Sequence, residues 1–412
     1  MSELSLTERL FQPLELARVC LPNRILRSAT YEGMADINGY PQKKLGTLYR
    51  SLTRKEPATM ITGFCAISRQ GRAMHPRQAA IGDDSYIPAW SGIVEDVKKE
   101  SPASRLFMQL AHTGRQTRAE MTGLPVVGAS RRRCLYFRQK VSTLDEAAIR
   151  RIIKDFGAAA YRAAQSGFDG VQIHAAHGYL LHQFLSPHTN RRKDGWKDGG
   201  RLLAEVVGEV SARCGESFPI LLKVSHADDR GLDAERVIAA LRPVASRIDA
   251  VEVSYGTMEF ALNIIRGDCP VAAVLKVNPL FSRFHPFVKT LWKHCFFPFM
   301  KACLKPYAPL YTLEGAAALR AALDVPVIPV GGVASLEDMW ICMEDFGFEA
   351  VSLCRPFIRE PDLLVGLRGG RWKRSLCTRC NLCTIYCDSD RSLRCYSGGG
   401  KREYGHAYTE EI

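Results

Sequence analysis

The chain has 412 residues, of which 46% are hydrophobic, so it can bury one large domain with an appendage or two ordinary domains. Its formal net charge of +13 suits phosphorylated cofactors, acyl-CoA, an acidic redox protein or an anionic membrane surface. It contains no helix-turn-helix, zinc-finger or aromatic-basic RNA-binding motif, so we expect no nucleic-acid partner. No apolar run is long enough for a membrane span, and the first 16 residues lack the apolar block of a signal peptide, which predicts a cytoplasmic protein.

Short apolar runs rich in β-branched residues alternate with helical stretches along most of the chain. Eight such runs separated by helical spacers favour an α/β fold, a closed (β/α)8 TIM barrel that occupies residues 1–374. In such barrels the functional groups lie at the carboxyl ends of the strands. The eight expected strands are Arg24–Thr30, Ala58–Cys65, Arg105–His112, Asp169–Ala176, Pro219–His226, Asp249–Tyr255, Val325–Gly332 and Glu349–Arg355.

The spacer before the fourth strand has a clear helical pattern. Thr143 and Glu146 have the spacing of a capping box, and the residues that follow place apolar side chains at helical intervals. Gly167 is expected to end this helix just before the strand begins.

A long insertion, residues 264–311, separates the sixth and seventh expected strands. We expect it to be a lid over the barrel, an amphipathic element that contacts a membrane surface, or an extra pair of helices packed on the barrel. It mixes aromatic with basic residues: Phe281, Phe284, Phe287, Trp292, Phe296, Phe297 and Phe299 with Arg283, Lys289, Lys293, Lys301 and Lys305.

Polar residues gather where the expected strands end. The fourth strand ends at His174, His177 and Tyr179, the seventh at the pair Gly331-Gly332, and the eighth at Arg355. Backbone amides of a glycine-rich loop and a nearby cation commonly bind phosphate at the last two loops of a barrel. The sequence therefore predicts a phosphorylated ligand in the barrel mouth, beside two histidines and a tyrosine.

Several short motifs in the same order resemble the old yellow enzyme and NADH:flavin oxidoreductase family. Together they extend from residue 10 to about residue 362. The motifs are LFQP at 10–13, LPNRI at 21–25, Gln109 with His112, Gly114 and Arg115, HAAHGYL at 174–180, FLSP at 184–187, NRR at 190–192, PVGG at 329–332 and RP at 355–356.

The resemblance implies a bound FMN. Ser28, Ala29, Thr30 and Gly63 would lie along the flavin, and Gln109 would hydrogen-bond its pyrimidine edge. Lys223 stands where the family usually has Arg, near flavin N1 and O2, and a cation there would tune the redox potential. The phosphate would be held by Gly331, Gly332, Val333, Cys354 and Arg355.

The same resemblance implies a mechanism of alkene reduction. Reduced flavin would deliver hydride from N5 to the β-carbon of an enone or enoyl thioester, and His174 and His177 would hydrogen-bond the substrate carbonyl. Tyr179 would protonate the α-carbon as general acid. A single histidine or tyrosine at a strand end is more often a packing residue, but here the three stand together within one motif.

A cysteine-rich tail, residues 375–412, follows the expected barrel. Cys377, Cys380, Cys383 and a fourth cysteine suit a [4Fe–4S] cluster, and a structural zinc site is the alternative. Cys387 and Cys395 both compete for the fourth position. The tail resembles the iron–sulfur branch of the family, represented by trimethylamine dehydrogenase and 2,4-dienoyl-CoA reductase, and this resemblance favours Cys395.

Two departures from that branch shape the expected partners. The larger relatives continue into dinucleotide-binding domains, whereas this chain ends at Ile412, so we expect electrons from a separate electron-transfer protein or directly from NAD(P)H. The segment after the sixth strand, SYGTME at 254–259, lacks the catalytic histidine of the dienoyl-CoA reductases. The alternatives are an oxidative dehydrogenase of the amine dehydrogenase type, a non-redox phosphate-binding barrel with a zinc tail, and a non-catalytic electron carrier.

Overall fold

The computed structural model describes residues 5–397, and its centre is a barrel of eight parallel strands. The strand order in the sheet is β12-β11-β10-β9-β6-β4-β3-β13, and a parallel bridge from Val330 to Ser352 joins the two ends. The predicted (β/α)8 barrel is therefore confirmed. Its strands are β3 (Ile25–Arg27), β4 (Thr59–Ile61), β6 (Arg105–Ala111), β9 (Gly170–Ala175), β10 (Ile220–Ser225), β11 (Ala250–Ser254), β12 (Val327–Pro329) and β13 (Val351–Leu353), with the short β5 (Cys65–Ala66) beside β6.

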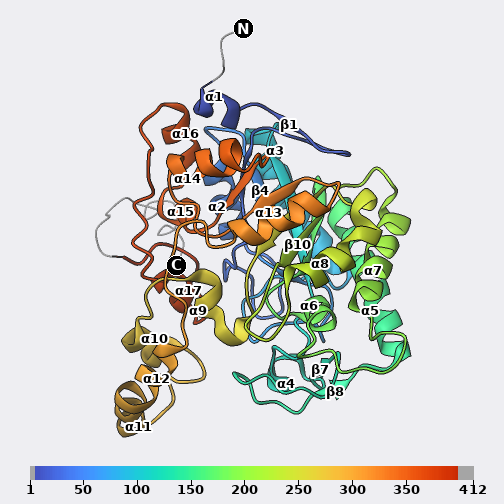
Figure 1. Ribbon diagram of the computed structural model, residues 1–412, viewed down its shortest axis with the longest axis vertical. Coiled ribbons are helices and arrows are strands. Elements are labelled where there is room, and N and C mark those ends of the chain that lie inside the picture. The colour runs from blue at the N-terminus through green and yellow to red at the C-terminus, as the bar shows by residue number, and fades with distance from the viewer. Residues whose placement is uncertain (1–4, 398–412) are drawn as a thin grey trace.

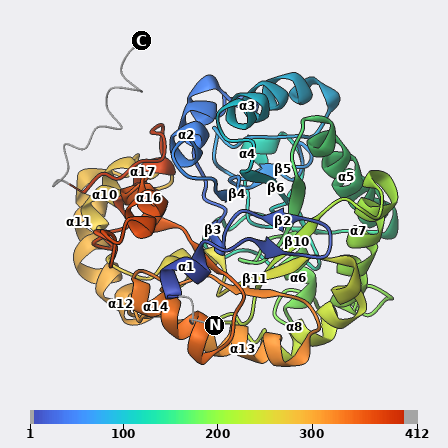
Figure 2. The ribbon, with the colours of Figure 1, turned by 90° about the horizontal axis from the view of Figure 1, so that it is seen from above.

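An antiparallel hairpin covers the amino-terminal end of the barrel. It consists of β1 (Leu14–Glu15) and β2 (Cys20–Leu21), which lie across the barrel axis in Figure 2. Leu14 and Leu21 pack into one apolar cluster with Phe107, Leu221 and other residues of the barrel strands. Since apolar side chains fill this end, the opposite end, where the strands terminate, is the end that carries the polar groups.

A ring of helices surrounds the barrel (Figure 2). The apolar faces of these helices and the outward-facing strand residues form one continuous core, as expected for helices that pack around a barrel. The ring includes α2 (Lys43–Thr53), α3 (Ile87–Glu100), α5 (Glu146–Gln165), α7 (Gly199–Cys214), α8 (Ala234–Leu241), α13 (Leu313–Ala322), α14 (Leu336–Trp340) and α16 (Leu363–Arg368).

The helix before the fourth strand is confirmed, but its predicted cap is wrong. Asp145 is the N-cap of α5, and its carboxylate accepts a hydrogen bond from the Ala148 N–H at 2.8 Å. Thr143 lies instead in the short strand β8 (Ser142–Thr143), which pairs with β7 (Val127–Gly128). An Asp directly before the helix reaches the first-turn amides more easily than a Thr already committed to a strand. Gly167 adopts a φ of +86° where the helix ends, as predicted.

The insertion forms several short helices that project beyond the barrel at the end away from the hairpin (Figure 1). They are α9 (Ala261–Ile265), α10 (Val271–Val277), α11 (Pro286–Leu291), a π-helix (Trp292–Phe296) and α12 (Phe297–Ala302). α10 packs against α17 (Leu382–Cys387) of the cysteine-rich tail. The remaining helices include α1 (Leu6–Leu10), α4 (Ala119–Thr122), α6 (Leu180–Leu185) and α15 (Arg355–Arg359). None of the helices in residues 5–397 has the length and apolar character needed to cross a membrane.

Candidate active site

The two histidines and the tyrosine predicted at the end of the fourth strand form one cluster. The His174 ring lies 4.9 Å from the Tyr179 ring and 5.1 Å from the His177 ring, measured between centroids. His174 is the penultimate residue of β9, and Tyr179 directly precedes α6. The polypeptide therefore turns sharply between them, so that residues five apart in sequence face the same space.

That turn depends on contacts from three other segments of the chain. His177 has a φ of +60°, which is uncommon for a residue with a side chain. The backbone N–H of His177 donates a hydrogen bond to the Ser225 hydroxyl. The His177 carbonyl accepts hydrogen bonds from the Gln116 side-chain amide and from the Met258 N–H. A Cβ at the next residue, Gly178, would lie 2.1 Å from the Gln116 amide nitrogen. The strained backbone is thus held by the last residue of β10 and by the segments after β6 and β11.

Both imidazoles are neutral, and a hydrogen bond at Nδ1 sets the tautomer of His174. His174 accepts a hydrogen bond from the Ala176 N–H at Nδ1, so its own proton lies on Nε2. His177 Nε2 lies 2.8 Å from the Ser254 hydroxyl. Burial, with the nearby Lys223 charge, lowers the pKa of both histidines well below the usual value, so both are neutral near pH 7.

The Tyr179 side chain is almost fully buried. Burial raises the pKa of Tyr179 above its ordinary value, and the negative charge of Asp388 raises it further. The phenol therefore keeps its proton near neutral pH and can donate it to a reacting group. Its ring also lies 5.4 Å from the ring of Phe64.

A buried polar network lies inside the barrel beneath this cluster. Lys223 Nζ donates to the Ser28 hydroxyl at 2.7 Å and to Glu252 Oε2 at 2.8 Å. Gln172 links the same carboxylate to Gln109, with the Gln109 amide 2.6 Å from Gln172 Oε1. Burial alone would raise the pKa of Glu252. The Lys223 ammonium and hydrogen bonds, including one from Ser352, have the larger combined effect, so the pKa of Glu252 is lowered overall. The Lys223 cation is therefore paired within the protein.

The predicted phosphate loop has free backbone donors. Within residues 5–397, the N–H groups of Gly332 and Val333 donate no hydrogen bond. Gly332 has a φ of +87°, and a Cβ there would lie 2.2 Å from the backbone nitrogen of Leu310, so the insertion also presses against this loop. Arg355 donates through Nη1 to the Arg266 carbonyl and to Asn381 Oδ1, both at 2.8 Å. Unpaired amides beside a guanidinium fit a phosphate group.

Three other predicted flavin residues follow the first two strands. Thr30 Oγ1 donates to the Ser28 carbonyl and lies 3.1 Å from Cys354 Sγ, and Ala29 between them is half-buried. Gly63 is expected beside the flavin, and its N–H donates to the buried carboxylate of Glu32 at 3.0 Å. A Cβ at Gly63 would lie 2.2 Å from that carboxylate. Any contact of Gly63 with a flavin would therefore be made without its N–H.

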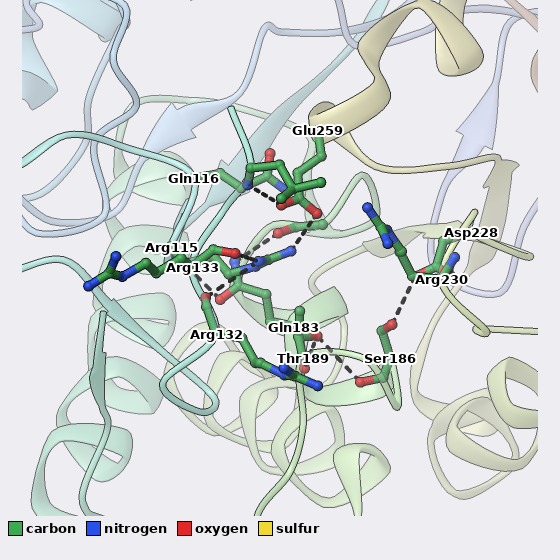
Figure 3. Close-up of polar contacts among 12 residues, drawn as sticks. Arg115, Gln116, Arg132, Arg133, Gln183, Ser186, Thr189, Asp228, Arg230 and Glu259 are labelled. Carbon is green, nitrogen blue, oxygen red and sulfur yellow. Dashed lines mark hydrogen bonds and ion pairs between the residues drawn. The ribbon is translucent and has the colours of Figure 1, made fainter. Parts of the chain in front are cut away.

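A buried ion pair at the barrel mouth was not predicted. Arg115 Nη2 lies 2.6 Å from Glu259 Oε2, and both side chains are almost completely buried (Figure 3). Arg115 also donates to the Arg133 carbonyl, and the Leu135 N–H donates to Glu259. The pair ties the loop around residues 131–135 to the segment after β11. Arg115 belongs to one of the family motifs in the sequence. Glu259 does not, and its role as the partner of Arg115 is apparent only from the folded structure.

The four cysteines predicted as metal ligands line a single pocket in the tail. The pocket is lined by Cys377, Cys380, Cys383 and Cys395, together with Arg355 and Arg359. The Nη1 atom of Arg359 lies 3.5 Å from Cys395 Sγ. Cys387 is absent from the lining, because it is buried with its Sγ 3.4 Å from the Tyr31 carbonyl oxygen. Within the part of the chain that the structure describes, no three His, Cys, Asp or Glu side chains are placed to hold a metal ion. The four thiols form a donor set of the soft type that iron–sulfur clusters and zinc require.

Sequence comparison identifies several curated relatives. The 4,4'-dithiodibutanoate disulfide reductase of Rhodococcus erythropolis is 26% identical over 92% of this chain and 94% of its own length. The metal reductase of Desulforamulus reducens is 32% identical over 64% of this chain, and the match covers only 40% of the length of that protein. The NADPH dehydrogenase of Bacillus subtilis is 30% identical over 64% of this chain and 78% of its own.

Two solved structures share the fold of this chain. A 2-naphthoyl-CoA reductase in complex with 2-naphthoyl-CoA matches with a TM-score of 0.78 and 19% identity, over 94% of this chain and 56% of its own. The old yellow enzyme homologue from Zymomonas mobilis matches with a TM-score of 0.68 and 22% identity, over 89% of this chain and 94% of its own. Residues 9–254, more than half of the chain, match the NADH:flavin oxidoreductase / NADH oxidase family. The chain belongs to this family of FMN-binding oxidoreductases.

Proposed function

We propose that this protein is an FMN-dependent reductase of activated C=C bonds in enones or enoyl thioesters, with a [4Fe–4S] cluster in its tail. The observation that carries the proposal is the cluster at the end of β9, where two neutral imidazoles and a protonated phenol face one space. Reduction of an activated alkene requires hydrogen-bond donors for the carbonyl and a proton donor for the α-carbon. This cluster supplies both.

Each residue has a defined part in the reaction. His174 Nε2–H donates to the substrate carbonyl, and His177 donates from Nδ1 when Ser254 occupies its Nε2. The donors stabilise the negative charge that develops on that oxygen. Bound FMN supplies the hydride for the β-carbon, with NAD(P)H or a separate electron-transfer protein as the source of electrons. Tyr179 transfers its proton to the α-carbon, so that the π bond is replaced by two C–H bonds.

The cofactor would be held by residues of β6 and β10 and of the segments after β3, β12 and β13. Gln109 and Lys223 would contact the pyrimidine edge of the flavin, and Ser28 to Thr30 would lie along its ring. The loop from Gly331 to Val333, where the amides of Gly332 and Val333 are unpaired, would hold the phosphate with Cys354 and Arg355. Because Glu252 pairs with Lys223, the cation would affect the flavin less than an unpaired charge would.

The tail pocket supports the iron–sulfur part of the proposal. Its wall includes Arg355, so a cluster held there would lie beside the phosphate end of the flavin site. Cys383 and Cys395 pack in one apolar group with Tyr31 and Cys354, the latter predicted at the phosphate. The rings of Tyr31 and Phe64 lie 5.6 Å apart, and Phe64 contacts Tyr179. The pocket lining favours Cys395 over Cys387 as the fourth ligand.

The substrate class is proposed from the reaction and from the relatives. The naphthoyl-CoA reductase binds an aromatic CoA thioester, and the Rhodococcus relative is named for the reduction of an organic disulfide. A useful panel therefore contains an enoyl-CoA, a cyclic enone, an organic disulfide and a tertiary amine, assayed anaerobically with NADH, NADPH and an artificial electron donor.

The first experiment is an anaerobic visible spectrum of the purified protein, with iron and zinc assayed on the same sample. We expect flavin bands above a broad iron–sulfur absorbance and about four irons per flavin. A colourless protein with one zinc, unchanged after reconstitution with iron, sulfide and FMN, would support the non-redox barrel instead. Amine oxidation without alkene reduction would support the oxidative dehydrogenase.

A further inference from the structure

The outermost part of the insertion is a helix that exposes an apolar surface. Residues 286–302 form one continuous helical run through α11, the π-helix and α12. Phe287, Phe296 and Phe299 are 70%, 60% and 78% exposed, and Val288 and Leu291 are also exposed. Figure 1 shows these helices at the extremity of the molecule. We call these five side chains the apolar tip.

The apolar tip is distinct from the packed side of the same helix. Trp292 lies 5.4 Å from Phe281 and 6.0 Å from Phe297 between ring centroids, and Phe281 contacts Tyr136 at 6.2 Å. Asn278 also donates to the Tyr136 hydroxyl. This stack anchors the helix to the loop between β7 and β8. Since the helix already has a packed face, its exposed phenylalanines are not needed to hold it in place.

The segment that carries the apolar tip is exclusively basic. No Asp or Glu occurs in residues 269–313, which contain Lys276, Arg283, Lys289, Lys293, Lys301 and Lys305. The neighbouring loop that carries Tyr136 adds more cations without any carboxylate: Arg131, Arg132, Arg133, Arg138 and Lys140. Arg283, Lys293 and Lys301 are exposed beside the apolar tip. A large exposed apolar group surrounded by charges of one sign is unusual on a surface that faces only water.

We propose that the apolar tip docks on an anionic lipid bilayer. Aromatic and aliphatic side chains on one face of a surface helix insert into the boundary between headgroups and acyl chains, while flanking lysines and arginines pair with anionic headgroups. Each basic residue near such a surface strengthens the binding. The absence of any carboxylate across residues 269–313 removes the repulsion that would oppose this contact.

The shape of the segment favours a bilayer over an acidic protein partner. The apolar side chains lie along a projecting helix whose residues are nearly all exposed from Arg283 to Phe296, apart from Lys289 and Trp292. A convex helix can insert into the fluid headgroup layer without a complementary groove. A protein partner would have to supply such a groove, so it is treated as a separate outcome of the test.

The test is co-sedimentation of the full-length, cofactor-loaded protein with sucrose-loaded vesicles. One set contains phosphatidylcholine alone, and the other contains phosphatidylcholine with 30% phosphatidylglycerol. We expect binding to the anionic vesicles at least about tenfold stronger than to the neutral ones, and weaker at high salt. Equal binding to both sets, or binding to neither, would overturn the proposal.

Two variants separate the apolar from the electrostatic contribution. Phe287→Ser combined with Phe299→Ser removes the most exposed rings, and we expect anionic-vesicle binding to fall about tenfold or more. Lys293→Gln with Lys301→Gln should lower binding by a similar factor and reduce its salt dependence. Trp340→Ser is the matched control, because Trp340 is 49% exposed on α14 outside the insertion. This control should bind as the parent does.

The same variants detect the other occupants. If the parent protein forms dimers in sedimentation and Phe287→Ser/Phe299→Ser abolishes them without any vesicle binding by the parent, the apolar tip binds a second copy and the lipid proposal is wrong. If vesicle binding is absent but an acidic electron-transfer protein binds the parent and not the variant, the surface is a protein-docking site and the proposal is equally wrong.

Discussion

The end of β9 and the cysteine-rich tail are built in opposite ways. At the end of β9, His177 is held by Ser225, Ser254, Gln116 and Met258, which belong to segments 20 or more residues away. In the tail, three of the four pocket cysteines lie within the seven residues from Cys377 to Cys383, and the fourth is Cys395. One site therefore depends on the assembled barrel, whereas the other depends mainly on local spacing.

The difference shows where function is vulnerable. Substitution of a tail cysteine removes a donor but leaves the barrel strands untouched. Substitution of a distant partner such as Glu252 changes the surroundings of Lys223 without touching any motif residue. Four experiments test this comparison, from the largest expected effect to the smallest.

The first compares Cys380→Ser with Cys387→Ser. Cys380 lines the tail pocket and Cys387 does not, so iron should fall from about four per chain to near zero only in Cys380→Ser. Iron and flavin are measured on anaerobically purified protein. FMN should be retained in both variants, because its site is formed by the barrel. Iron loss in both variants would assign the fourth position to Cys387 instead of Cys395.

The second is Tyr179→Phe. Loss of the phenol proton should lower kcat for alkene reduction by about 10²- to 10⁴-fold, because a positioned general acid contributes that much. The ring contacts with His174 and Phe64 would remain, so flavin content should not change. Stopped-flow measurement of flavin reduction by NAD(P)H is the control, since that step does not need the proton from Tyr179. Unchanged turnover would remove Tyr179 from the mechanism.

The third is Glu252→Gln, which leaves the buried Lys223 ammonium without its carboxylate. Breaking a buried pair in this way typically costs about 3 kcal/mol or more of the free energy of unfolding. The matched control is Glu120→Gln, which disrupts the exposed pair with Arg118 and should cost less than about 1 kcal/mol. Denaturant unfolding of both variants gives the comparison. If both substitutions lower the free energy of unfolding equally, the carboxylate of Glu252 does not stabilise the buried Lys223 ammonium.

The fourth concerns pH. Burial lowers the pKa of His112 to about 3, so the folded state resists protonation while the unfolded state accepts a proton near pH 6.5. The unfolded state therefore binds more protons, and stability decreases as pH falls below 6.5. His112→Gln should reduce this loss by about 1.4 kcal/mol per pH unit between pH 5.5 and 4. Denaturant unfolding at several pH values measures the slope, and identical slopes would contradict the shift.

The sequence predicts the barrel well because each strand is a short apolar run that remains buried on both sides. It also predicts His174, His177 and Tyr179, which stand in one motif. It does not reveal Glu252, Gln172 or Ser254, because each is a polar residue inside an expected strand, and only closure of the barrel brings them together. The role of Gly63 is obscured for the same reason, since its partner Glu32 follows a different strand.

The wall shared by Tyr31, Cys354 and the tail cysteines has a consequence for biogenesis. Tyr31 follows the first barrel strand and Cys354 the last, so this wall exists only after β3 has paired with β13. The tail is synthesised after both strands, and domains generally fold as units during synthesis. Maturation of the proposed iron–sulfur site would thus be ordered, with the barrel closing before iron is loaded. A lesion in the β3–β13 seam should therefore appear in cells as an iron-loading defect, even when every cysteine is intact.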